Sequence, residues 1–463
     1  AAFLDLLARH DVDVYALARD VTVDNRTYKA GQSYIIPTRQ SQYTMIRGLF
    51  DRVVDFEENV FYDVSGWTMP LAYDLDYSDL DGVRFNNSLL GKPATSLDLK
   101  KPAPAASDYG YIFDWDDYYA PRALYRFLKN GAYARVLMRP KDIAAGGVRR
   151  TYDRGAIFVP VSGQEISAER LSQIAVTAAA DDFVDIRGVD SGNAAAGVGD
   201  LGSRGSVRSI KKPSVLLLFD DGVARYSAGQ LWHLLDHKMN IPVVLRRKGT
   251  IGDIDLGDYS HIILPDGGRA RLSDDDADAV DAWIRNGGVF IATKRAAAWA
   301  QTAFLKEAIA GNDGDQNGKK NGDAGAPDRF NYEDKTIRDA KHVVAGSLFA
   351  SDLDVTHPLA FGHRDRDVAS MKASPQTLKT PRDPVATVAV YKEAPLLSGY
   401  ASEKRLEEIA GTPMLTANRH GAGSIVLFAD DPAFRATFPG TEKLFLNALF
   451  FAPVVDRAAI VEE

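Results

Sequence analysis

The sequence contains no cysteine, and this absence excludes several kinds of chemistry at once. Disulfide bonds, cysteine-ligated zinc, iron–sulfur clusters and a thiol nucleophile all need the missing side chain. A basic surplus is missing too, because 63 acidic residues outnumber 55 basic ones and give a net charge of −8. Nucleic-acid binding normally needs clustered positive charge, so no nucleic-acid partner is expected. No apolar run approaches the roughly 20 residues that span a bilayer.

The remaining composition is that of an ordinary globular protein. The chain of 463 residues is 45% hydrophobic and 25% charged, which is enough for about three domains. It begins within an amphipathic helical pattern, AAFLDLLARH, and has no initiator Met. We therefore expect a fragment or processed product from which a signal peptide has been removed, and a periplasmic or secreted location.

A repeated phrase marks the first part of the chain. Residues 26–37 read RTYKAGQSYIIP and residues 150–160 read RTYDRGAIFVP. Each phrase follows a helical pattern and a short apolar segment, which predicts helix, strand, polar turn and strand twice. The glycines Gly31 and Gly155 suit a turn with positive φ. We predict a repeat-containing α/β region over 1–186, with copies at about 1–40 and 109–165 and a connection at 56–108.

The second part of the chain has a different pattern. Residues 187–212 are rich in Gly and Ser without apolar periodicity, which predicts a linker. Over 213–463, short apolar strands alternate with helical patterns, as in a doubly wound, mainly parallel sheet. Ser273 and the aspartates after it predict a capped helix start. The expected strands are 214–219, 241–245, 259–264, 289–293 and 423–428, and the expected helices are 226–239, 274–286 and one from 444 onward.

Ligands of such sheets bind beyond the carboxyl ends of the strands. The loops at these ends are rich in Asp and Gly, and they define a candidate ligand-binding crevice. The alternative is that these residues only cap helices and turn the chain. The candidate residues are Asp220, Asp221, Asp266, Gly267, Lys294 and Asp430.

The segment 291–297 is a strand, turn and helix of the kind that carries the nucleophile in hydrolases and amidotransferases. Its sequence, IATKRAA, has neither Cys nor Ser and no flanking glycines, so thiol acyl transfer is excluded there. Lys294 could hold an anionic ligand, but a solvated lysine is the expectation. No catalytic residue is assigned.

Two motifs match metal sites incompletely. His233 and His237 belong to HLLDH, which departs from H-x-x-E-H because Asp replaces Glu, and a structural role is expected. The second motif, DGDQNG, matches the first half of a calcium-binding loop. The bidentate Glu that such a loop needs at its twelfth position is replaced by Ala324. Its surroundings favour a disordered polar insertion. The oxygen ligands in question are those of Asp313, Asp315 and Asn317.

Several phrases distributed over nearly the whole chain resemble one known arrangement. They are YDVSGWTMPLAYDL (62–75), VDSGN and DLGS within 189–203, VLLLFDDGVARYSAGQLWHLLD (215–236), HPLAFG (357–362) and GAGSIVLFADDPAFRATFPGTEKLFLNALFF (421–451). Together they resemble the region downstream of the catalytic domain in large bacterial zinc-carboxypeptidase-like proteins of the carboxypeptidase A type. Residues 213–463 also look like the class I glutamine-amidotransferase fold without its Cys nucleophile.

The resemblance implies that zinc and the catalytic Glu belong to a domain upstream of these residues. It therefore implies no cofactor and no metal site in this chain, and an exported parent protein. The upstream peptidase domain would be a partner. The short HPLAFG motif itself is expected to be structural.

These observations lead to three hypotheses. The first is a non-catalytic accessory region that supports the peptidase domain or binds peptide or cell-wall-derived ligands. The second is a hydrolase that uses carboxylates at the carboxyl edge of the sheet, with Asp220, Asp266, Lys294 and Asp430 in the crevice. The third is a calcium-stabilised binding module.

Overall fold

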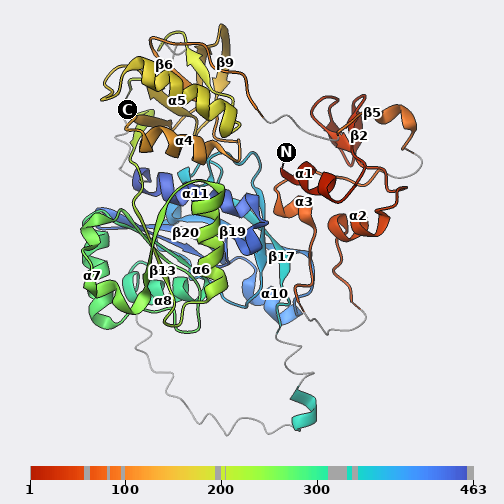
Figure 1. Ribbon diagram of the computed structural model, residues 1–463. Helices are drawn as coiled ribbons and strands as arrows, with labels where there is room; N and C mark the ends of the chain where they lie inside the picture. The colour runs from red at the N-terminus through yellow and green to blue at the C-terminus, as the bar shows by residue number, and fades with distance from the viewer. Residues whose placement is uncertain are drawn as a thin grey trace.

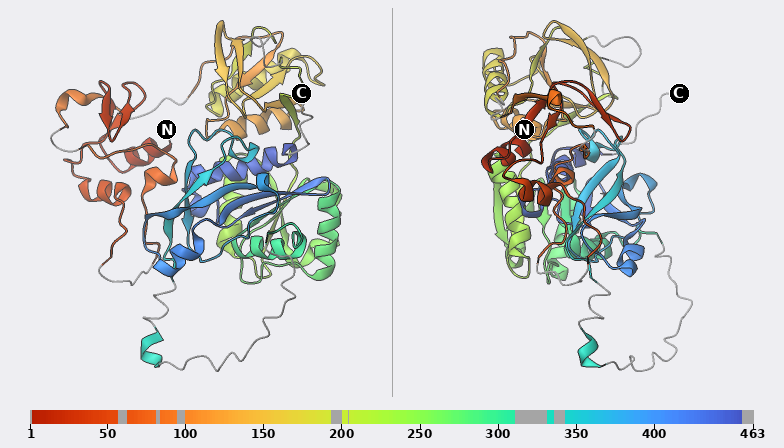
Figure 2. Two further views of the ribbon diagram at one scale, coloured as in Figure 1. Left: turned by 180° about the vertical axis from the view of Figure 1, so that it is seen from behind. Right: turned by 90° about the vertical axis from the view of Figure 1, so that its right-hand side faces the viewer.

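The protein is a mixed α/β molecule whose described residues form two large sheets and two small ones, shown as a computed structural model in Figure 1. We distinguish an N-terminal unit (2–94), a middle unit (100–210) and a C-terminal unit (213–455). In Figures 1 and 2 the middle unit lies above the C-terminal unit. The N-terminal unit lies to the right of both in Figure 1. The structure describes residues 2–56, 63–80, 84–94, 100–192, 200–203, 205–310, 331–335 and 343–455.

The N-terminal unit is small and packs around its first helix. Phe3 and Leu7 on this helix are buried against Val12, Val14 and Ile46. A three-stranded sheet has the order β4-β1-β5, and β2 pairs with β3 as a separate hairpin. The elements are α1 (Ala2–Arg9), β1 (Tyr15–Leu17), β2 (Val21–Val23), β3 (Arg26–Tyr28), β4 (Tyr34–Ile35), α2 (Tyr43–Phe50), α3 (Met69–Ala72) and β5 (Leu90–Pro93).

The middle unit contains a seven-stranded sheet with the order β12-β7-β10-β6-β11-β8-β9. In both this unit and the N-terminal unit, a helix is followed by a strand, a hairpin and a further strand. In each unit, the strand before the hairpin pairs antiparallel with the strand after it: β1 pairs with β4, and β7 pairs with β10. The elements are β6 (Gly110–Phe113), α4 (Ala120–Lys129), β7 (Ala134–Leu137), β8 (Lys141–Ala145), β9 (Val148–Tyr152), β10 (Ile157–Pro160), α5 (Ala168–Asp181), β11 (Arg187–Val189) and β12 (Val207–Ile210).

The predicted glycine turns are present in both phrases. Gly31 has φ +76° and Gly155 has φ +89°, a region that a residue with a Cβ rarely adopts. The predicted linker needs correction, because both ends of 187–212 are strands of the middle sheet. β11 pairs with the central strand β6, and β12 pairs with β7. Their pairing partners lie far away in sequence, so local composition did not indicate them.

The C-terminal unit contains a nine-stranded sheet with the order β14-β13-β15-β16-β21-β20-β19-β17-β18. The first five strands pair parallel, and the others pair antiparallel. The prediction of a mainly parallel sheet thus describes only one half. The strands are β13 (Val215–Phe219), β14 (Val243–Arg247), β15 (His261–Leu264), β16 (Val289–Thr293), β17 (Ser347–Leu353), β18 (Asp367–Lys372), β19 (Thr387–Ser398), β20 (Pro413–His420) and β21 (Gly423–Phe428).

The helices of this unit follow local signals closely. Ser273 accepts a hydrogen bond from the backbone N–H of Asp276 at 3.3 Å, which is the predicted cap of α7. The predicted helix 226–239 has two parts, α6 and a π-helix over His233–Lys238. The helices are α6 (Arg225–Trp232), α7 (Asp274–Arg285), α8 (Lys294–Phe304), α10 (Glu403–Ile409) and α11 (Pro439–Phe451).

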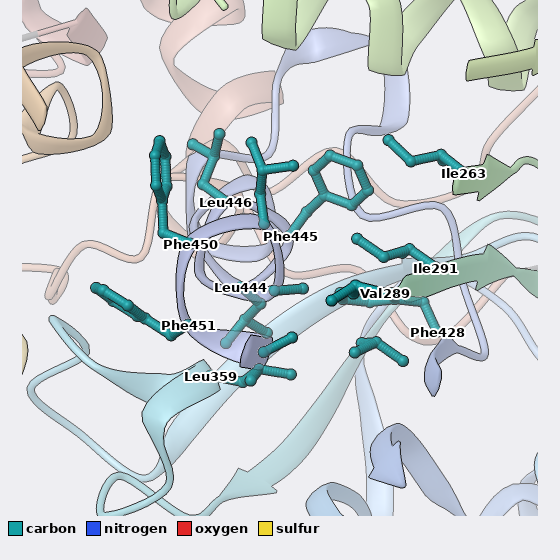
Figure 3. Packing of buried hydrophobic residues seen from close by; sticks show 14 of the residues in the cluster. Ile263, Val289, Ile291, Leu359, Phe428, Leu444, Phe445, Leu446, Phe450 and Phe451 are labelled. Atoms are coloured by element: carbon teal, nitrogen blue, oxygen red, sulfur yellow. The ribbon is translucent and has the colours of Figure 1, made fainter. Parts of the chain in front are cut away.

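The last helix, α11, is the centre of the main core. Leu444 and Phe445 lie toward Ile263 and Ile291 of the parallel strands and Phe428 of β21 (Figure 3). Every residue of α11 from Gly440 to Phe451 is buried, so the helix has no solvent-exposed side. This explains why its second half, from Leu444 to Phe451, is apolar apart from Asn447, since a helix with a single buried face alternates with polar residues.

The middle and C-terminal units meet along α11. The Trp115 indole N–H donates to Asn447 at 2.6 Å, and both side chains are buried. Glu442, which is also buried, accepts from Lys238 at 2.9 and 3.0 Å and from the hydroxyl of Tyr118. One hydrophobic cluster includes residues from both units, so these two units share a core.

Candidate ligand-binding crevice

The bend between β16 and α8 positions Lys294, the central residue of the predicted crevice. β16 ends at Thr293, and Lys294 begins the helix with φ +50°. A non-glycine residue with this left-handed backbone is uncommon and typical of functional or strained sites. The prediction that Lys294 is solvated is wrong, because its side chain is only 14% exposed. It is buried because two carboxylates from neighbouring loops lie over it.

Lys294 forms ion pairs on two sides. Its Nζ lies 3.3 Å from Asp266 Oδ2 and 3.5 Å from Asp431 Oδ2. Burial alone lowers the pKa of Lys294, but the charges of Asp431, Asp266 and Asp430 outweigh this effect and raise the pKa. The amine therefore remains a cation at neutral pH.

Asp266 is held by a second cation as well. Arg295 donates to its two oxygens at 2.8 and 2.9 Å, and the backbone N–H of Arg295 donates at 3.2 Å. Burial raises the pKa of Asp266, but Arg295 and Lys294 together lower it below its usual value. This bidentate geometry is among the strongest that a carboxylate forms with a side chain.

Asp431 is the functional candidate that the sequence analysis did not select. Burial raises its pKa above the usual value, and Lys294 offsets this only in part. The hydroxyls of Ser227 and Thr293 lie 3.3 and 3.5 Å from its oxygens. The prediction named Asp430, and nothing in the local sequence ADDP distinguishes Asp430 from Asp431.

Asp430 lies in a different network, within the antiparallel half of the sheet. It accepts from Lys372 at 3.2 Å and Ser370 at 2.9 Å, and also from the hydroxyl of Tyr391. Burial lowers the pKa of Lys372, against the charge of Asp430. All four side chains are buried. The sequence analysis therefore placed Asp430 at the correct strand end but with the wrong neighbours.

Asp220 and Asp221 are not part of the Lys294 cluster. Arg247 lies 3.7 Å from Asp220 and 3.0 Å from Asp221. The backbone N–H of Gly249, followed by Arg247, lowers the pKa of Asp221. These aspartates belong to the partly exposed loop between β13 and α6, where they pair with Arg247 and not with Lys294.

Gly267 has a packing role. A Cβ at this position would lie 2.1 Å from the carbonyl oxygen of Gly222, which no side chain tolerates. The same loops are joined by the backbone N–H of Ala224, which donates to the carbonyl of Asp266 at 2.7 Å. Gly267 therefore lets two loops of the crevice pack against each other, as the capping-and-turn alternative expected.

The histidines of the two remaining motifs have local partners. His357 accepts a hydrogen bond from the backbone N–H of Leu359 at 3.1 Å, and burial lowers the pKa of His357 to about 4. This agrees with the structural role expected for HPLAFG. The rings of His233 and His237 are stacked with their centroids 5.4 Å apart, and burial lowers the pKa of His233. The candidate calcium loop at 313–317 lies outside the described residues.

Open depressions occur on the described surface at two places that include no residue of the Lys294 cluster. One is lined by residues 38–41 and Tyr43, and the other includes Leu128, Tyr133 and Lys212. Within the described ranges, no group of three or more His, Asp or Glu side chains could enclose a metal ion. Each helix in the part of the chain that the structure describes is too short or too polar to cross a membrane.

Comparisons with known proteins give distant structural similarity. No model of a protein family matches the sequence, and no curated protein matches it. A ThuA-like protein from Parabacteroides merdae is 13% identical with a TM-score of 0.34, over 53% of this chain and 92% of that one. A ThuA-like protein from Bacteroides uniformis is 10% identical with a TM-score of 0.31, over 51% and 89%.

A β-galactosidase from Bacillus circulans is also similar over part of its length. It is 13% identical with a TM-score of 0.31, over 61% of this chain and 34% of that one. TM-scores of this size indicate neither a shared family nor a shared activity. The interpretation of the crevice therefore rests on its own geometry.

Proposed function

We propose that the chain is a non-catalytic accessory region of an exported metallocarboxypeptidase-like protein, and that its crevice binds a ligand. The observation that supports this most is the position of Lys294. It occupies the strand–helix bend where an amidotransferase-like sheet carries its nucleophile, and its ammonium is ion-paired with Asp266 and Asp431. A protonated amine in two ion pairs is a poor nucleophile. The peptidase parent and the exported location are proposed from the sequence phrases alone.

The proposal includes two finer statements about the fold. The N-terminal and middle units would be copies of one repeat, since both have the same order of elements and the same antiparallel closing pair. The C-terminal unit would be a doubly wound, amidotransferase-like domain to which an antiparallel half-sheet is added. The parallel order β14-β13-β15-β16-β21 and the bend at Lys294 support this.

The ligand we propose is an anionic one, such as a peptide carboxylate or a cell-wall-derived peptide. Arg225, the first residue of α6, and Arg269, on the loop after β15, are both exposed and lie next to segments that hydrogen-bond to each other. Neither forms an ion pair within the described residues. Tyr226 beside them is 90% exposed and offers an aromatic surface for packing. Free arginines are well suited to carboxylates because their planar donors bind both oxygens.

Calorimetric titration with short peptides that carry free carboxyl groups tests this function. Binding is expected for the wild-type chain, and the double variant Arg225→Ala and Arg269→Ala should lose it. The matched control is Lys211→Ala, which removes an exposed cation elsewhere. Binding that is equal in all three proteins would contradict the crevice. Zinc-dependent release of amino acids by the purified chain would contradict the accessory role.

One observation favours the hydrolase as a second candidate. Asp266 and Asp431 both pair with Lys294, but the pKa of Asp266 is lowered and the pKa of Asp431 is raised. Two neighbouring carboxyl groups with pKa values shifted in opposite directions are typical of acid–base catalysis. A hydrolase would lose turnover in Asp431→Asn under conditions where circular dichroism shows the variant folded. The accessory function predicts no turnover before or after this substitution.

A further inference from the structure

The two histidines of the HLLDH segment have no part in the proposed function, and their setting is unusual. His233–Lys238 form a π-helix that continues α6 directly. Such segments are rare and occur frequently at functional sites. The imidazole planes of His233 and His237 differ by only 13°, with ring centroids 5.4 Å apart. The π-helical turn therefore places two imidazoles side by side on one surface of the helix.

Both rings keep nitrogen atoms that could bind a ligand. His233 Nδ1 is buried and has no hydrogen-bond partner among the described residues. His237 is exposed, and its ring packs against the edge of Trp232 with centroids 4.7 Å apart. The neighbouring cation, Lys238, is ion-paired with Glu442 at 2.9 Å. This pairing reduces the repulsion that Lys238 would exert on a second cation nearby.

We propose that His233 and His237 form a binding site for a divalent cation that prefers imidazole, of the class of Cu²⁺, Ni²⁺ and Zn²⁺. Neutral imidazole is the commonest protein ligand of such metals. Two histidines four residues apart on one helix face are the arrangement that helical zinc motifs use. The Glu of H-x-x-E-H is a catalytic base and not a metal ligand. Its replacement by Asp in HLLDH therefore argues against a peptidase but leaves both metal-binding histidines in place.

The geometry also sets the character of the site. Because no third His, Asp or Glu joins the pair within the described residues, water would complete the coordination and the ion would exchange readily. The site lies where the middle unit touches this turn, since Arg122 donates to the carbonyl of Lys238 at 3.5 Å. A bound ion would therefore stabilise the turn at this contact.

The test is a titration of the whole chain with CuCl₂, NiCl₂ and ZnCl₂, followed by calorimetry and tryptophan fluorescence. One equivalent should bind, with Cu²⁺ binding more tightly than Ni²⁺ or Zn²⁺. Because Trp232 packs on His237, bound Cu²⁺ should quench its fluorescence. Trp232→Phe should keep the calorimetric binding and lose most of the quenching.

Substitution of the exposed histidine makes the proposal falsifiable without disturbing the core. His237→Ala should weaken Cu²⁺ binding at least about tenfold, since it removes one of two protein ligands. His10→Ala, which removes another exposed histidine, should leave the affinity unchanged. Equal Cu²⁺ affinity in wild type and His237→Ala, with circular dichroism showing both folded, would overturn the proposal. So would the absence of saturable binding by the wild-type chain.

Discussion

Lys294 has an unfavourable backbone conformation, and its side chain forms ion pairs that offset this cost. A left-handed residue with a Cβ costs about 1–3 kcal/mol, and φ at Lys294 is +50°. The ion pairs with Asp266 and Asp431 hold the residue in place. Removing the ammonium leaves Asp431 buried without a cation, which is more harmful than the loss of an exposed pair.

We predict that Lys294→Met destabilises the protein by about 3 kcal/mol, within the range for breaking one side of a buried ion pair. Urea unfolding followed by circular dichroism measures this difference. Lys211→Met, at an exposed position, should change stability by less than about 0.5 kcal/mol. Equal effects of both substitutions would show that the crevice network contributes nothing to folding.

His261 provides a pH-dependent contribution at the opposite end of the parallel strands. Burial lowers its pKa from 6.5 to about 4, so the folded state favours neutral imidazole. The stability that depends on this neutral form is complete above pH 6.5 and is lost as the pH falls toward 4. We predict a decrease of about 3 kcal/mol over this interval from His261 alone.

Urea unfolding at a series of pH values tests this expectation. The variant His261→Asn can keep the hydrogen bond that Ser260 makes with the ring, 2.8 Å in length, but it does not titrate. Its stability should change less between pH 6.5 and 4 than that of the wild type. Parallel curves for the two proteins would contradict the assignment.

At the scale of elements, α11 decides how the C-terminal unit packs. Its residues contact the parallel strands on one side and the middle unit on another. Phe445 is fully buried, so its replacement leaves a cavity that the surrounding helices and strands fill only partly.

Phe445→Ala should therefore lower the free energy of unfolding by about 3–5 kcal/mol. Phe445→Leu should cost clearly less, because it keeps most of the buried volume. The measurement is the urea midpoint, compared at equal slope. A cost below about 1 kcal/mol for the alanine variant would contradict the central position of the helix.

At the scale of the whole molecule, the middle and C-terminal units are joined by buried polar contacts. Glu442 is fully buried and pairs with Lys238, which also donates to the carbonyl of Ala436 at 2.7 Å. The hydroxyl of Tyr118 completes the contact from the middle unit. Such a contact is specific, because each unpaired partner would be left without water.

We predict that Glu442→Gln destabilises the protein by about 3 kcal/mol, because it breaks the pair with Lys238, and that the loss of the carboxylate at Tyr118 increases cleavage between the units in limited proteolysis. Asp352→Asn, which disrupts the exposed pair with Arg366, is the matched control and should cost less than about 1 kcal/mol. Intact units and identical digestion patterns for both variants would show that the shared apolar core alone joins them.

The local features of this protein could be predicted from the amino-acid sequence. Apolar runs marked the parallel strands, Ser273 marked the start of α7, and the absence of cysteine excluded a thiol at the bend. These features depend on neighbours within a few residues, so periodicity and capping chemistry are enough to find them. The phrases around Gly31 and Gly155 likewise indicated their turns.

The pairing of charged side chains, in contrast, depends on the packing of distant parts of the chain. Lys294 and Asp431 are 137 residues apart, and whether a lysine is solvated or buried depends on such distant partners. The same holds for Asp430, which pairs with Lys372 in strands that the sequence patterns did not reveal, and for β11 and β12 within the predicted linker. Burial changes the strength and pKa of every charged group, and burial is a property of the packed chain.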